Sequence, residues 1–203
     1  ATMAQEEITL GPGTTSFFVT PEDFPEGVTI NVPGGVSIDE LLILPVADPD
    51  TLSSTPPLEI NIDGTVGSAT LDTENFDINA FVPVSNLRIG ASGVVSNLAL
   101  NGGASITNNG AIAMAPSDSS LGGTALFLAS PFNANSGTTS AYTISNNGSV
   151  SVSGGNFPGG IFGNTIVAYG GDGTVPSPVS LTLDNTGNIS LGPDTTGTLV
   201  RWR

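Results

Sequence analysis

The phrase that decides the fold is Ile106-Thr107-Asn108-Asn109-Gly110-Ala111-Ile112, because the chain repeats it. It returns as Ile144-Ser145-Asn146-Asn147-Gly148-Ser149-Val150 and as Leu183-Asp184-Asn185-Thr186-Gly187-Asn188-Ile189. Each copy has an aliphatic residue, three small or polar residues, a glycine, a spacer and a second aliphatic. Asn and Gly tolerate the backbone conformations of tight turns, and the two aliphatics can face one core. Each copy therefore predicts a strand, a tight turn and a second strand.

Looser copies of the phrase occupy residues 30–36, 60–66 and 89–95, so the six copies start 30, 29, 17, 38 and 39 residues apart. Such irregular spacing is typical of stacked coils that share one strand-turn unit and carry different insertions. We expect the aliphatic residues of successive copies to be buried in register. We also expect the glycines Gly110, Gly148 and Gly187 to have positive φ or to lie against neighbouring backbone.

The predicted fold is therefore all-β, a parallel β-solenoid of the β-helix type. Residues 1–27 lack the repeat and are predicted to form an N-terminal cap or an exchangeable strand segment, because a stack of coils needs its open end covered. Residues 28–203 form the repeat domain, with an acidic part (28–85) and a neutral part rich in Asn and Gly (86–203). The alternative is a β-sandwich or jelly roll, which also has many short strands and turns.

Composition excludes several classes of function. The formal net charge is −15, with three Arg, no Lys, no His and no Cys. Nothing could neutralise the phosphates of a nucleic acid or an anionic membrane, and no apolar run is long enough for membrane insertion. Without His, Cys or Lys, the usual nucleophilic triads, Schiff bases and zinc sites cannot form. We therefore expect a protein that is not an enzyme.

A calcium site is the chemical hypothesis that the acidic part of the chain permits. Asp48, Asp50, Asp72 and Glu74 place oxygen donors in consecutive predicted loops, and calcium prefers six to eight oxygen ligands. The alternative is a solvated acidic surface that keeps the protein soluble.

The repeated phrase at 106–112 and its copies resembles the passenger regions of bacterial autotransporters and filamentous-haemagglutinin-like adhesins. In those families, phrases of the type aliphatic-x-Asn-x-Gly-x-aliphatic build right-handed parallel β-helices on the cell surface. The resemblance covers residues 86–200 well and residues 28–85 poorly. It implies a β-helix at a cell surface and names no ligand.

These observations predict a secreted or cell-surface structural protein, a filament-forming subunit without enzymatic activity. Ala1-Thr2-Met3-Ala4-Gln5 resembles the small-residue end of a secretory signal, which agrees with export. One alternative is an adhesin or fibre-type module that binds cell-surface glycans. Another is a carbohydrate-active β-helix enzyme, although the internal base it would need is limited to Arg88.

The chain itself is the predicted partner, through strands at its two ends. The N-terminal strand is the apolar run Phe17, Phe18 and Val19. The C-terminal strand contains Leu199, Val200, Arg201, Trp202 and Arg203 and carries two of the three positive charges. An acidic N-terminal half and a cationic C-terminus predict a head-to-tail contact, which generates an open filament unless rotation closes it.

Overall fold

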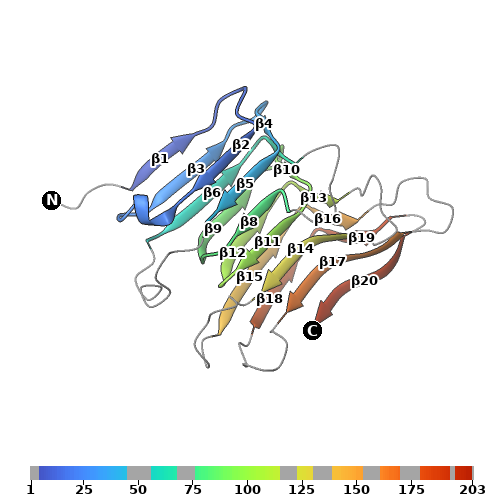
Figure 1. Ribbon diagram of the computed structural model, residues 1–203. Helices are drawn as coiled ribbons and strands as arrows, with labels where there is room; N and C mark the ends of the chain where they lie inside the picture. Colours follow the sequence, from blue (N-terminus) through green and yellow to red (C-terminus); the bar gives the residue numbers. More distant parts are fainter. Residues whose placement is uncertain are drawn as a thin grey trace.

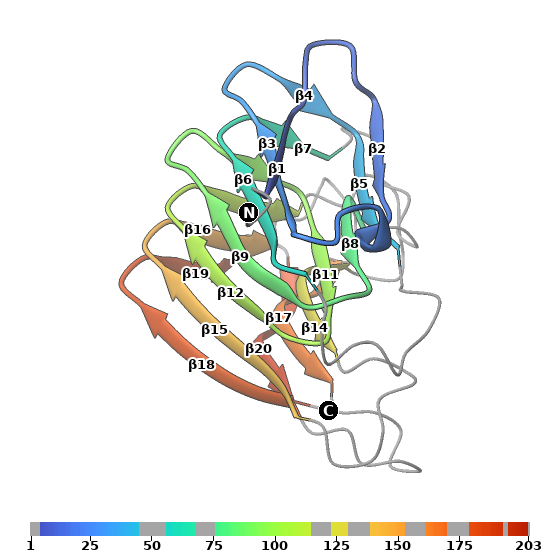
Figure 2. The same ribbon diagram turned by 90° about the vertical axis from the view of Figure 1, so that its left-hand side faces the viewer.

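The chain winds into a stack of β-coils. The computed structural model describes residues 5–44, 56–67, 76–114, 123–129, 139–152, 161–169, 179–192 and 195–202 of the 203. Figure 1 shows the stack from the side, with β1 at one end and β18, β19 and β20 at the other. Figure 2 shows that each coil passes around three sides. We name the three sides sheets A, B and C.

Each sheet takes one strand from each successive coil, except that the first turn contributes none to sheet C. Sheet A contains β1 (Glu6–Thr9), β3 (Val28–Val32), β6 (Leu58–Ile62), β9 (Val84–Ile89), β12 (Ala104–Asn108), β15 (Ser140–Asn146) and β18 (Val179–Asn185). Sheet C contains β4 (Ser37–Ile38), β7 (Thr65–Val66), β10 (Val94–Val95), β13 (Ala111–Met114), β16 (Ser149–Val152) and β19 (Asn188–Leu191). Sheet B contains β2 (Ser16–Val19), β5 (Glu40–Ile43), β8 (Ile78–Ala80), β11 (Leu98–Asn101), β14 (Gly123–Ala129), β17 (Ile161–Tyr169) and β20 (Thr195–Trp202). One short 3-10 helix, η1 (Pro21–Asp23), follows β2.

The predicted parallel β-solenoid is confirmed. From β3 onward the chain repeats the order sheet A, sheet C, sheet B, and every strand pairing in the described residues is parallel. A β-sandwich or jelly roll is built from antiparallel strands, so this pairing excludes the alternative. The turn from sheet A to sheet C is short in each coil, and it is the turn of the repeated phrase.

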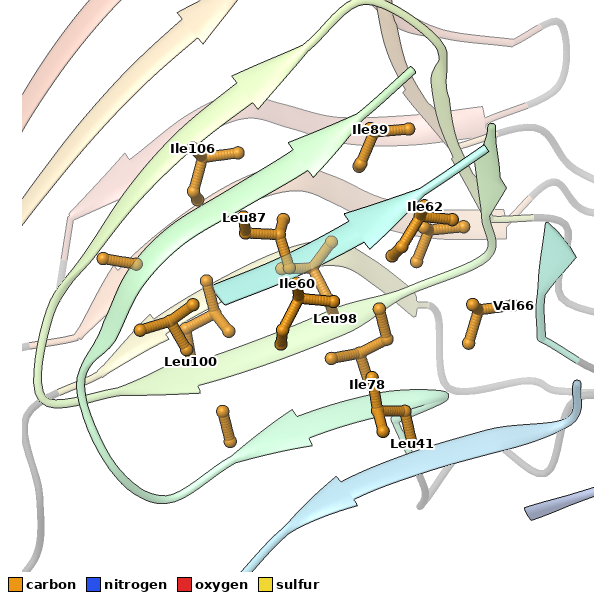
Figure 3. Close-up of a cluster of buried hydrophobic side chains, with 14 of the residues drawn as sticks. Leu41, Ile60, Ile62, Val66, Ile78, Leu87, Ile89, Leu98, Leu100 and Ile106 are labelled. Carbon is orange, nitrogen blue, oxygen red and sulfur yellow. The ribbon is translucent and has the colours of Figure 1, made fainter. Parts of the chain in front are cut away.

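The core is a set of aliphatic rows that run through the middle of the stack. In sheet A, Ile30, Ile60, Leu87, Ile106 and Ile144 are consecutive partners in one row, and none is more than 1% exposed. Figure 3 shows side chains from all three sheets meeting in the interior. A fully buried Leu or Ile stabilises the fold by roughly 1.5–3 kcal/mol, so these rows supply most of the driving force for stacking.

The tight copies of the phrase stack in the predicted register. Ile144 pairs with Ile106 and Leu183, and Val150 pairs with Ile112 and Ile189. Two loose copies were aligned wrongly, because their turns between sheets A and C are two residues longer. In the sheet C row, Ile38 rather than Val36 precedes Val66. In the sheet A row, Leu87 rather than Ile89 stands beside Ile106.

The glycines of the phrase stack against one another through their backbones. A Cβ atom on Gly148 would collide with the carbonyl oxygen of Gly110, and one on Gly187 would collide with that of Gly148. The prediction of close backbone contact is confirmed. Positive φ is not the reason, because the described glycines with positive φ lie elsewhere, for example Gly102 and Gly103. The coils approach too closely at this corner for any side chain.

A ladder of asparagine side chains runs beside these glycines. The side-chain amide of Asn108 donates to Asn146 Oδ1 at 2.7 Å, and that of Asn146 donates to Asn185 Oδ1 at 2.6 Å. Asn108 and Asn146 are both 0% exposed. In earlier coils the same row holds Val32, Ile62 and Ile89. The row can accept Asn because each buried amide finds its partner one coil away.

Tyr142 is the largest fully buried side chain of the core, and it spans the corner between sheets B and A. Its hydroxyl lies 2.6 Å from the carbonyl oxygen of Leu100 and 2.5 Å from that of Ala129, and shares its proton between them. Burial raises the pKa of Tyr142 to about 12, although hydrogen bonds to the backbone oppose the shift. The hydroxyl therefore stays neutral and serves the carbonyls of Leu100 within β11 and of Ala129 at the end of β14.

The N-terminal segment forms the first turn of the same stack. β1 pairs with β3 and β2 pairs with β5, both in parallel. This first turn has no strand in sheet C, since sheet C begins at β4. Leu10 and Val19 are 5% and 1% exposed, so the narrow first turn already covers part of the core.

Candidate assembly interface

The last coil leaves its core side chains partly open. In the coil before it, Tyr142, Ile144, Val150 and Val152 are at most 1% exposed. Their partners in the last coil are only partly buried, although they have the same apolar character and stand in the same rows: Leu181, Leu183, Ile189 and Leu191. We call the exposed side of β18, β19 and β20 the C-terminal face. Its described inward side chains are apolar and partly buried, and the edges of the three strands surround them.

The asparagine ladder is also left open at this face. Asn108 and Asn146 each donate to a side chain and to a backbone carbonyl of the following coil. Asn185 instead donates back to the carbonyl of Gly187 in its own turn, at 3.3 Å. Asn185 is exposed, whereas its two ladder partners are buried. The C-terminal face therefore offers polar groups in positions that another strand could satisfy.

The opposite end of the stack is built differently. Glu6 stands in the row of Val28, which is 2% exposed, and Leu58, which is 1% exposed. A further coil placed against β1 would enclose the carboxylate of Glu6 among apolar side chains. Burying an unpaired charge is costly, and charged residues in inward rows are a known means of protecting sheet edges. A carboxylate in this row therefore disfavours the addition of a strand against β1.

Charge also distinguishes the two ends. The first turn carries five exposed acidic residues and no basic one: Glu6, Glu7, Glu22, Asp23 and Glu26. The charged residues in the three strands of the C-terminal face are Asp184 and Arg201, and their formal charges cancel. In a chain with a net charge of −15, the C-terminal face is a region where another acidic body meets little repulsion.

The residues predicted for self-association fall on different surfaces. Val19 is core, Phe17 packs partly buried against it, and Phe18 is 57% exposed on the outer side of sheet B. In β20, Leu199 is 46% exposed and Val200 packs against the core.

The structure describes the remaining predicted residues only in part. Arg201 and Trp202 are described in their backbone alone, where they pair in register with Val167 and Ala168. Arg203 lies outside the described residues. The calcium hypothesis lies there as well, because Asp48, Asp50, Asp72 and Glu74 are not among the residues described. Within the described part, no group of three acidic, His or Cys side chains is arranged to hold a metal ion.

Arg88 stands on the outer side of sheet A. Its guanidinium lies 3.3 Å from a carboxylate oxygen of Asp63, and both side chains are 44% exposed. Exposed ion pairs of this kind contribute about 0–1 kcal/mol to the free energy of unfolding, so this pair adds little to the stability of the fold.

Sequence reasoning assigned residues 199–202 of β20 to self-association but missed the inward residues of β18 and β19 as part of the same face. Leu183 and Ile189 were predicted to be buried, and the structure leaves them half-buried. In the structure β18 and β19 each pair on one side only, so the rows of Leu183 and Ile189 have one neighbouring coil. Glu6 could have been found from the sequence by extending the row of Val28 towards the N-terminus.

Comparisons with protein-family models, curated proteins and solved structures found no match for this chain. The described part of the chain contains no helix of the length and apolarity that a membrane span requires.

Proposed function

We propose that this protein is a structural β-solenoid, without enzymatic activity, that associates end to end through its C-terminal face. The observation that carries the proposal is the change in burial between the last two coils. Ile144 and Val150 are buried, while their row partners Leu183 and Ile189 are half-buried. Apolar surface gathered in one patch and rimmed by polar groups is typical of association sites.

Strand addition would supply both affinity and geometry. The edges of β18, β19 and β20 present backbone donors and acceptors along three sides of the face, and a matching edge can complete them. Burial of the aliphatic rows adds an apolar contribution of about 25 cal/mol per Å² removed from water. The extracellular or cell-surface setting expected from the sequence remains part of the proposal, since a stack of coils suits a structural spacer.

The test is the oligomeric state of the chain and of a variant charged at the face. Leu183→Lys places a cation among the apolar rows of the C-terminal face and should abolish association. The matched control is Val94→Lys, which replaces a 36% exposed valine on the outer side of sheet C, away from both ends. Sedimentation velocity should show concentration-dependent association for the wild type and the control only. Association of Leu183→Lys equal to that of the wild type would contradict the proposal, provided that both melt at similar temperatures.

A further inference from the structure

The geometry points to the C-terminal face of a second copy as the partner, so that two solenoids stack face to face in a closed dimer; this inference rests on the proposed function. Two surfaces of the chain could in principle meet the C-terminal face of another copy: the N-terminal turn or the C-terminal face itself. The choice between them decides whether the assembly is an open filament or a closed pair.

The N-terminal turn is a poor partner for this face. Stacking β1 on β18 would bring Glu6 into the inward rows of the last coil, where Leu181 and Leu183 stand, with no basic side chain in those rows to pair with it. β1 also has only four residues against the seven of β18. A head-to-tail contact would therefore bury a carboxylate and leave part of the β18 edge uncovered.

A second C-terminal face avoids the buried carboxylate and matches β18 along its whole length, while the four residues of β19 cover only part of the eight of β20. A two-fold axis through Thr182, the middle residue of β18 (Val179–Asn185), pairs all seven residues of the strand with those of its copy in antiparallel order. Leu181 then lies opposite Leu183 of the other copy, so the inward residues stay inward. Asp184 lies opposite Ser180 of the other copy, so the two acidic side chains do not meet. The same axis exchanges sheets B and C and brings β19 against β20 of the other copy.

The polar groups of the face agree with this arrangement. Asn185, which folds back on Gly187 in the single chain, would lie opposite Val179 at the end of the copy's β18, where that strand's backbone can accept or donate. Antiparallel pairs exchange backbone hydrogen bonds in both directions, so one edge can complete an identical edge. The surface is self-complementary, as an isologous interface requires.

The test uses a single cysteine, since the chain has none of its own. Thr182→Cys places a thiol on the two-fold axis, at the outer side of β18, where Thr182 is exposed. Residues directly opposite in an antiparallel pair have Cα atoms about 4.5–5.5 Å apart, which a disulfide can bridge. The matched control is Thr143→Cys, the exposed partner of Thr182 one coil earlier. In a head-to-tail stack of seven coils, two copies of Thr182 would lie about 30 Å apart.

We expect mild oxidation to convert Thr182→Cys largely into a disulfide-linked dimer, and to cross-link Thr143→Cys at least about tenfold less. The mass of the wild-type assembly should not rise above twice 20.3 kDa as the concentration increases. Species that keep growing beyond the dimer, or equal cross-linking of the two variants, would overturn the face-to-face arrangement and leave end-to-end association standing. A wild-type chain that stays monomeric at all concentrations would overturn both.

Discussion

Asn108 donates a hydrogen bond of 2.7 Å to Asn146 across 38 residues of sequence, and both side chains are completely buried. The two residues occupy the same position of the repeated phrase in successive coils. One position of the repeated phrase thus supplies both partners of a buried hydrogen bond, because the two coils stack in register.

Asn146 is the centre of the ladder, and its loss should be costly. Asn146→Ala removes the acceptor of Asn108 and the donor to Asn185, leaving a buried amide without one of its partners. The free energy of unfolding should fall by about 1–3 kcal/mol in urea titrations. The matched control is Asn147→Ala, in the exposed outer ladder beside it, where the loss should be at most about 0.5 kcal/mol. Equal losses for the two variants would contradict the role of the buried ladder.

Tyr142 should make the protein sensitive to alkali. Its pKa is about 12 in the folded chain and about 10 when unfolded, so the unfolded state releases its proton first. Stability from this group is complete below pH 10 and is lost as the pH rises from 10 to 12. At about 1.4 kcal/mol for each pKa unit, the loss is roughly 2–3 kcal/mol.

Tyr142→Phe is the variant that checks this pH dependence. At pH 7 it should be about 1–3 kcal/mol less stable, because the carbonyls of Leu100 and Ala129 lose their donor. Between pH 10 and 12, however, its stability should fall by less than that of the wild type. The absence of Lys keeps the number of other groups that titrate in this range small. Parallel stability curves for the two proteins above pH 10 would refute the assignment.

Salt should strengthen self-association. Each copy carries a net charge of −15, while the C-terminal face itself is nearly neutral, so salt mainly screens repulsion between the two bodies. Raising the ionic strength from about 10 mM to about 150 mM, which shortens the screening length from roughly 30 Å to 8 Å, should lower the Kd measured by sedimentation. Weaker association in salt would instead indicate the attraction between acidic and basic ends that a head-to-tail contact uses.

Glu6 is predicted to limit assembly at the other end of the stack. Glu6→Leu continues the apolar row of Val28 and Leu58 into β1 and should allow N-terminal ends to associate, giving species larger than a dimer. Glu7→Leu is the control, because it removes the same charge from a residue that stands in the outward row of Thr29. If light scattering finds identical masses for both variants, Glu6 has no protective role.

The fold was predictable from the sequence because the seven residues 106–112 indicate a strand, a tight turn and the aliphatic residues that face the core. The register of the early coils was not predictable, because loose copies of the phrase do not reveal that their turns differ in length. Val36 and Ile89 were therefore assigned to the wrong positions in their rows. Part of the candidate site was predictable in principle. Which inward apolar residues remain exposed depends on the order in which the coils stack. Choosing apolar strands near the two ends of the sequence, such as Phe17 to Val19, does not reveal that order.

Amide hydrogen exchange in β18 as a function of protein concentration tests the assembly face most directly. Alternate amides of this edge strand face away from β15 and should exchange rapidly in dilute protein. We predict that they become protected as concentration rises, together with amides of β19 and β20, while the amides of β1 do not change. Protection that appears at β1, or edge amides of β18 that exchange equally fast at every concentration, would contradict assembly through the C-terminal face.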